Sequence, residues 1–230
     1  MDSNPSDSSK YATDAYKTTN TLKSGVPYYD YVIITSNALS SAFNDFVAWK
    51  KLKGYDVGVV TWQSIRANFP NGDLLNGIND TAGSIREYLL HAYYNGTIYC
   101  LIGGDMDVVP GRYGTGTWDM WDNGNFKIPT DLYYSDFNGN WDVDNDIYLG
   151  EPISSGNKTG DNLDFNPEIF VGRLLVATAG QVQNWFSKLK IYENNPGLGD
   201  YSYLKKVLFT EADLLSYSPI LSHINWTNDT

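Results

Sequence analysis

The feature that most constrains the fold is an alternation between short runs of β-branched apolar residues and longer amphipathic stretches. This alternation is typical of parallel strands that are covered by helices. The amphipathic stretches end at Gly54 and Gly96, where glycine is well suited to stop a helix. The elements predicted in this way are strand 29–36, helix 40–54, strand 56–62, helix 81–96 and strand 97–105.

Connections between parallel strands are right-handed almost without exception, so this order predicts a doubly wound α/β fold. We expect a mostly parallel sheet flanked by helices in three layers, with a ligand crevice at the carboxyl ends of the strands. Helical periodicity disappears between Val108 and Asn166, where Gly, Asp, Asn, Trp and Pro dominate. A loop of that length is uncommon in a compact domain unless something orders it.

The pattern resumes after this region with a predicted strand at 168–176, a helix at 178–195 and a strand at 205–215. The polar residues at the beginning of the chain predict a disordered leader. The expected organisation is a leader over 1–27, an N-terminal α/β subdomain over 28–200 with an acidic loop near 131–151, and the start of a second, incomplete subdomain over 201–230.

The charge balance limits the partners of the protein. The chain has 27 acidic and 16 basic residues, a net charge of -11, which argues against nucleic acid and anionic membrane surfaces and favours cations. No run of apolar residues is long enough to predict a membrane span. Abundant Tyr and Trp add support for a secreted or cell-surface protein. So do the Asn-x-Ser/Thr sequons at Asn79, Asn95, Asn157, Asn225 and Asn228.

Residues 136–151 (DFNGNWDVDNDIYLGE) concentrate acidic side chains in one short loop. Counted from Asn140 as the first position, the oxygen-bearing side chains have nearly the spacing of a calcium-binding loop. Asn145 then falls where such loops need a left-handed residue, and Glu151 falls at the position of a closing bidentate ligand. The predicted calcium ligands are Asn140, Asp142, Asp144, Asp146 and Glu151.

Two other interpretations of this loop stay open. Asp136 and Asn138 offer an alternative register for the ligands. The loop can also be a solvated acidic turn without a metal, because turns rich in Asp and Asn are common and no flanking helices are predicted. Without a counter-ion, however, the acids of this stretch repel one another.

Few residues indicate a catalytic group. Cys100 lies in the middle of an apolar strand, which predicts a buried and inert thiol. Neither His91 nor His223 has a partner at the spacing of a metal site or a catalytic pair. The motifs of serine hydrolases, phosphate-binding loops and zinc peptidases are absent from the sequence.

Acidic residues also follow two predicted strands. Asp105 and Asp107 follow the strand at 97–105, and Glu211 and Asp213 lie toward the end of the strand at 205–215. Acids there can bind substrate, for which Glu211 and Asp213 are the candidates, or they can cap the next turn. Arg173 is costly inside a sheet unless it is paired, and Asp105 is its predicted partner.

Four ordered blocks of the sequence carry a resemblance to a known family: residues 46–61, 99–112, 129–144 and 167–193. Together, over about residues 29 to 211, they resemble the first half of the catalytic domain of gingipain-type cysteine peptidases. The resemblance implies a caspase-like α/β fold and calcium in the N-terminal subdomain. It also implies a second subdomain with a catalytic pair, a His followed by Gly and a Cys at the end of the next strand.

No residue of this chain matches that catalytic pair, so we assign no catalytic residue. The resemblance implies that the parent protein is a secreted cysteine endopeptidase, which acts on proteins or peptides through its second subdomain, and that this chain alone is inactive. The alternative is a non-catalytic, calcium-stabilised surface or adhesion module with the same fold. Trp118, Trp121 and Trp141 would then stack on sugars or on a protein partner, although packing around the acidic loop is the more ordinary use of these residues.

Overall fold

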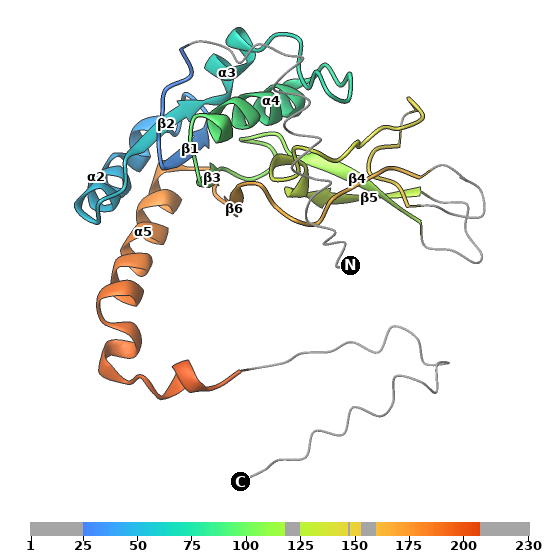
Figure 1. Cartoon of the computed structure of the whole chain (residues 1–230). Helices are drawn as coiled ribbons and strands as arrows, with labels where there is room; N and C mark the ends of the chain where they lie inside the picture. Colours follow the sequence, from blue (N-terminus) through green and yellow to red (C-terminus); the bar gives the residue numbers. More distant parts are fainter. Residues whose placement is uncertain (1–24, 118–124, 147, 153–159, 208–230) are drawn as a thin grey trace, which may run out of the picture. The chain divides into compact units, whose positions relative to one another are not determined.

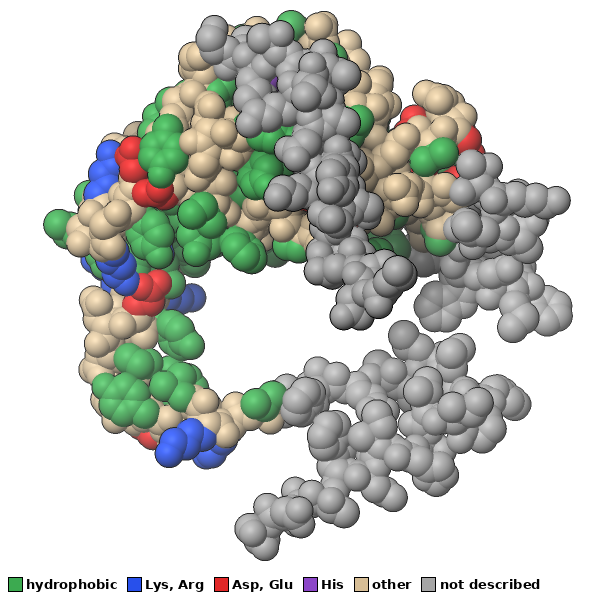
Figure 2. Space-filling model, viewed as in Figure 1, with side chains coloured by type: hydrophobic (Ala, Val, Ile, Leu, Met, Phe, Trp, Pro, Cys, Tyr) green, Lys and Arg blue, Asp and Glu red, His purple; other side chains and the backbone are tan. Residues whose placement is uncertain are grey.

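The structure is a computed structural model that describes residues 25–117, 125–146, 148–152 and 160–207. All other residues are grey in Figure 1 and Figure 2. The chain divides into two compact units, residues 1–186 and 187–230. The first unit holds both sheets and most of the helices. The described part of the second unit holds the end of helix α5 (Ala179–Asn194) and the short 3-10 helices η3 (Pro196–Gly199) and η4 (Ser202–Lys205).

The centre of the first unit is a four-stranded parallel sheet (Figure 1). The strands have the order β2-β1-β3-β6, so the chain adds strands on one side of β1 and then on the other. This confirms the predicted doubly wound, mostly parallel α/β fold. The strands are β1 (Tyr31–Thr35), β2 (Val57–Thr61), β3 (Tyr99–Gly103) and β6 (Phe170–Leu174).

Helices cover both faces of this sheet because alternate strand residues point to opposite sides. Val32, Ile34, Cys100 and Ile102 belong to one buried cluster with side chains of α3 (Trp62–Asn68) and α4 (Thr81–Tyr94). On the other face lie η1 (Ser40–Phe43) and α2 (Asn44–Leu52). There the Phe43 ring lies so close to β3 that a Cβ on Gly103 would be 2.5 Å from it.

The ends of two helices confirm the prediction from glycine. Gly54 and Gly96 have φ angles of 92° and 106°, in the left-handed region that glycine adopts without strain. Helix α3 was not predicted, because the sequence indicated a strand over 56–62. In the structure the strand ends at Thr61, whose side chain caps α3 by accepting a hydrogen bond from the backbone N of Ser64 at 3.4 Å.

The region between Val108 and Asn166 contains an antiparallel hairpin of β4 (Arg112–Thr117) and β5 (Asn125–Thr130), followed by η2 (Leu132–Tyr134). The hairpin was not predicted from the sequence. Residues 208–215 of the strand predicted at 205–215 lie outside the described residues. Residues 205–207 are described; they form no strand and include the end of η4. Among the described helices, none combines the length and the apolar character that crossing a membrane requires.

Candidate metal centre

Three of the predicted ligands come together in the acidic loop. Carboxylate oxygens of Asp142, Asp144 and Asp146 lie within 4.8 Å of one another. The loop winds tightly because Asp142 Oδ1 accepts a hydrogen bond from the backbone N of Asp146 at 2.9 Å. Asn145 has a φ of 58°, which confirms the left-handed conformation expected at this position. We call Asp142, Asp144 and Asp146 the aspartate cluster.

Glu151, another predicted ligand, is not in the group of oxygens that lie within 4.8 Å of one another, but the charges of these acids act on it. Its side chain is 4% exposed, and its Oε1 has no hydrogen-bond partner among the described residues. Burial raises the pKa of Glu151, and the negative charges of the aspartate cluster and of Asp161 raise it further. A buried carboxylate oxygen without a donor is costly, and repulsion from neighbouring acids adds to that cost. A cation bound between these groups would remove both penalties.

Asp161 is a member of this site that sequence reasoning missed. Its Oδ1 accepts from the backbone N of Val143 at 2.7 Å, and its Oδ2 accepts from the backbone N of Glu151 at 3.0 Å. Its own backbone N donates to the Glu151 carbonyl at 2.8 Å. Asp161 therefore ties the beginning of the loop to its end. It lies ten positions after Glu151, beyond the spacing of a single binding loop, so the pattern gave no signal for it.

In the structure, Asn140 makes hydrogen bonds within the protein at the start of the loop. Its Oδ1 accepts from the backbone N of Asp142 at 3.0 Å, and its backbone pairs with Asn162 through two hydrogen bonds of 2.9 Å. These contacts set the direction in which the chain enters the loop. The predicted role of Asn140 as a metal ligand stays a prediction.

The residues of the alternative register lie in a turn of their own. Asp136 is fully buried, and its Oδ1 accepts from the backbone N of Gly139 at 2.6 Å. Its Oδ2 accepts from the indole N of Trp141 at 3.0 Å and from the backbone N of Asp164 at 3.1 Å. Both oxygens of Asp136 are thus occupied by protein donors, which suits a structural role better than a metal ligand.

Asn138 is bound in the same turn by Glu168, which also was not predicted. Glu168 Oε1 accepts from Asn138 Nδ2 and Oε2 accepts from the backbone N of Phe137, both at 2.7 Å. Burial raises the pKa of Glu168 to about 7, against the opposing effect of the Phe137 hydrogen bond, and the charges of Asp136 and Asp164 raise it as well. Glu168 therefore holds the start of the acidic loop.

A buried polar network attaches this turn to helix α4. Arg86 donates through Nη1 to Asp73 Oδ2 at 2.8 Å, and through Nε and Nη2 to the carbonyl of Asp136 at 3.0 and 2.6 Å. Asn76 Nδ2 donates to Asp73 at 2.6 Å, and Asn76 Oδ1 accepts from the backbone N of Trp141 at 3.0 Å. The loop is therefore positioned by a rigid helix, as a preformed binding site requires.

The strand-end prediction for Arg173 is wrong in its partner. Arg173 Nε and Nη2 donate to the two carboxylate oxygens of Asp131 at 2.7 and 2.8 Å. Asp105 instead caps the turn after β3, where its Oδ1 accepts from the backbone N of Asp107 at 3.2 Å and of Val108 at 3.1 Å. Asp105 is thus used for capping, which the sequence had left open as an alternative role.

The remaining candidates fall into two groups. Cys100 is buried, as predicted, and burial raises the pKa of its thiol well above the ordinary value. His91 is buried on α4, and its Nε2 lies 3.3 Å from Glu87 Oε1. The candidates Glu211, Asp213 and His223 lie outside the described residues.

Comparison with known proteins gives a family and a set of similar structures. The family model described as peptidase family C25 matches residues 26–228. A solved structure titled as a protease has 21% identity and a TM-score of 0.45, with 83% of this chain and 33% of that chain covered. The Arg-specific cysteine proteinase gingipain R has 17% identity and a TM-score of 0.44, with 75% of this chain and 30% of that chain covered.

Latent PorU from Porphyromonas gingivalis has 16% identity and a TM-score of 0.44, with 74% of this chain and 16% of that chain covered. A search of curated proteins found no match. The chain therefore spans a third or less of the length of these solved structures.

Proposed function

Because the chain belongs to peptidase family C25, we propose that it forms the N-terminal, calcium-binding part of a secreted or cell-surface cysteine endopeptidase. The substrates of the parent protein are proteins or peptides, and its catalytic His and Cys lie in a second subdomain. The match of the family model to residues 26–228 is the observation that carries this proposal.

The described residues support a division of labour in which this part is not catalytic. A cysteine peptidase needs an accessible thiolate whose proton is managed by a nearby His. Cys100 is buried in the sheet, and its raised pKa keeps the thiol protonated. His91 lies on α4 with its Nε2 3.3 Å from Oε1 of Glu87 on the same helix, whereas Cys100 lies on β3. Neither residue has the environment of a catalytic pair.

We therefore expect the purified chain to have no thiol-dependent peptidase activity. The measurement is cleavage of a diverse peptide pool by the wild-type chain and by Cys100→Ala, with and without a reducing agent. Both proteins should leave the pool intact. Cleavage by the wild type that disappears in Cys100→Ala would contradict the proposed division. Extension of the chain by the second subdomain should restore activity if the parent is a peptidase.

Calcium is the cation that best suits the donor set of the acidic loop. The aspartate cluster and Glu151 offer only carboxylate oxygens, which are hard ligands that calcium prefers and that zinc and copper sites rarely use alone. The unpartnered Oε1 of Glu151 supports an ion at this place more strongly than the cluster alone does. Bound calcium would neutralise the mutual repulsion of these acids and order the loop.

Calcium should raise the melting temperature of the chain, because it binds the folded loop and not the unfolded one. At a free concentration of a hundred times Kd, the stabilisation is about 2.7 kcal/mol. Calorimetry with calcium and with a chelator measures it. The double variant Asp142→Ala, Asp144→Ala should lose the response. If calcium does not change the melting temperature of the wild type, the loop is a solvated acidic turn without a metal.

The single substitution Glu151→Gln tests whether the loop binds a metal or is held by packing alone. Glu151→Gln removes a buried charge that neighbouring acids repel, so the variant should melt higher than the wild type in chelator. In calcium it should gain less than the wild type, because one ligand charge is gone. Asp107→Asn, which removes one carboxylate charge at an exposed position after β3, is the control and should change neither value.

The adhesion alternative gains no support from the described residues. Trp141 is 1% exposed, and its ring packs edge-on against Tyr133 with centroids 5.2 Å apart. It is therefore part of the core and does not offer a stacking surface. Trp118 and Trp121 lie outside the described residues.

A further inference from the structure

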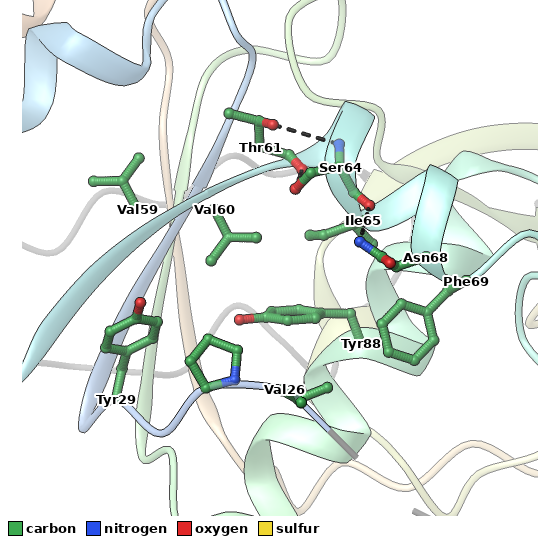
Figure 3. Close-up of a pocket in the computed structure, with 12 residues that line it drawn as sticks. Val26, Tyr29, Val59, Val60, Thr61, Ser64, Ile65, Asn68, Phe69 and Tyr88 are labelled. Atoms are coloured by element: carbon green, nitrogen blue, oxygen red, sulfur yellow. Dashed lines mark hydrogen bonds between the residues drawn. The ribbon is translucent and has the colours of Figure 1, made fainter. Parts of the chain in front are cut away.

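A pocket of about 400 Å³ lies on the α3 and α4 side of the sheet, away from every residue assigned above to the acidic loop. It is enclosed by the second half of β2, by α3, by α4 and by the segment that leads into β1 (Figure 3). None of its lining residues carries a charge. Its apolar wall includes Val60, Ile65 and Phe69.

The walls of the pocket are fixed by contacts within the protein. The Tyr29 ring lies directly over Gly58, where an added Cβ would be 2.2 Å from the ring. The segment before β1 is held by Asn95, whose Nδ2 donates to the carbonyl of Val26 at 3.0 Å. A pocket with such supports is largely formed before a ligand arrives, as small-molecule sites usually are.

One polar group in the pocket lacks a partner. The side chain of Tyr88 is 4% exposed, and its hydroxyl has no hydrogen-bond partner among the described residues. Figure 3 shows this hydroxyl pointing away from α4 into the space between Val60 and Tyr29. Burial raises the pKa of Tyr88, so the hydroxyl keeps its proton and is a donor. A buried hydroxyl without a partner is destabilising, so its retention needs an explanation.

Three other polar side chains of the pocket, Thr61, Ser64 and Asn68, already make hydrogen bonds within α3 and its cap. Ser64 Oγ donates to the Thr61 carbonyl at 2.9 Å, and Asn68 Nδ2 donates to the Ser64 carbonyl at 2.9 Å. Figure 3 shows Ser64 and Asn68 along α3 and the Tyr88 ring between Phe69 and Tyr29. The pocket thus combines an apolar wall with the hydroxyl of Tyr29 and the buried, unpartnered hydroxyl of Tyr88, and none of its lining residues is charged.

We propose that this pocket binds an uncharged ligand that joins an aromatic or branched apolar group to a carbonyl oxygen, with the oxygen accepting a hydrogen bond from Tyr88. Small neutral amides are the chemical class that meets both requirements. The volume accommodates one such group and its amide. This inference is independent of the peptidase and calcium proposals, because none of its residues belongs to the acidic loop.

The test uses N-acetylphenylalanine amide as the probe and N-acetylphenylalanine as its charged counterpart. Amide chemical shifts of the whole chain, measured by NMR during titration, report the site and the affinity. The neutral probe should shift residues around Val60, Ser64 and Tyr88. The carboxylate should bind at least about tenfold more weakly, because the pocket offers its charge no partner. Shifts confined to other surfaces, or equal binding of both probes, would overturn the proposal.

Tyr88→Phe is the decisive variant. Loss of one neutral hydrogen bond should weaken binding of the amide by about 5–10-fold. Without ligand the variant should melt as high as the wild type or higher, since it removes an unsatisfied buried hydroxyl; this result also shows that the variant folds. Tyr55→Phe, which deletes a hydroxyl outside the pocket, should leave affinity unchanged. Equal affinity of Tyr88→Phe and wild type would rule out the assigned donor.

Discussion

Replacement of Arg86 by Ala is expected to lower the free energy of unfolding by about 3–5 kcal/mol, the usual cost of removing one partner of a buried ion pair. Arg86 and Asp73 are 2% and 1% exposed, so solvent does little to screen the attraction between them. The substitution leaves the Asp73 carboxylate with the neutral donors Tyr133 and Asn76. It also removes the donors to the carbonyl of Asp136, to which the acidic loop is attached.

Urea unfolding of a mutant cycle measures this effect. Arg86→Ala and Asp73→Asn should each be strongly destabilising, whereas the double variant should cost less than their sum, because the second change no longer leaves a charge unpaired. Lys51→Ala, at an exposed position of α2, is the control and should stay within about 0.5 kcal/mol of the wild type. If Arg86→Ala behaves like that control, the buried network does not hold the loop.

The central sheet was predictable because parallel strands that are covered on both faces are continuous apolar runs. The runs around Val32, Cys100 and Val171 are short and bounded by polar or turn residues, which makes their ends readable. The two glycines that end the helices are equally local signals, since only the backbone of one residue decides the conformation. Elements of this kind can be predicted without knowledge of the tertiary structure.

The hairpin of β4 and β5 lacked such a signal. Its first strand is RYGTGT, with glycine at positions 114 and 116 and no alternating apolar face. Helix α3 was missed for another reason: it follows β2 with no intervening loop, so the sequence shows one continuous run through Trp62. In both cases pairing or capping decides the structure, and the hydrophobic pattern does not.

The acidic loop was predictable in its spacing but not in its surroundings. The alternation of acids is visible in the sequence, and it places Asp142, Asp144 and Asp146 together as expected. That Glu151 is buried and feels the charges of these acids, or that Asp161 ties the loop ends, depends on how separate segments meet. Charge pairing across such distances is a property of the tertiary fold, which the sequence pattern does not encode locally.

The partner of Arg173 was predicted wrongly for the same reason, because this contact also joins separate segments of the chain. Loss of this contact is the second large effect that we expect. Arg173→Ala should lower the free energy of unfolding by about 3 kcal/mol, at the lower end of the range for buried pairs because Asp131 is 24% exposed. Besides Asp131, Arg173 Nη1 donates to the carbonyls of Gly104 and Val109, both at 2.8 Å. One guanidinium therefore joins the ends of β3 and β6 to the segment that follows the hairpin.

Two mutant cycles distinguish Asp131 from Asp105 as the partner. Asp131→Asn should lose much of its effect when Arg173 is already Ala, because the two side chains share a bidentate contact. Asp105→Asn weakens the turn cap and should lower the free energy of unfolding by about 1 kcal/mol. This loss should be the same whether or not Arg173 is present. Chemical denaturation of the six proteins gives both coupling energies. A coupling of Arg173 to Asp105 as large as that to Asp131 would restore the pairing expected from the sequence and contradict the contact described here.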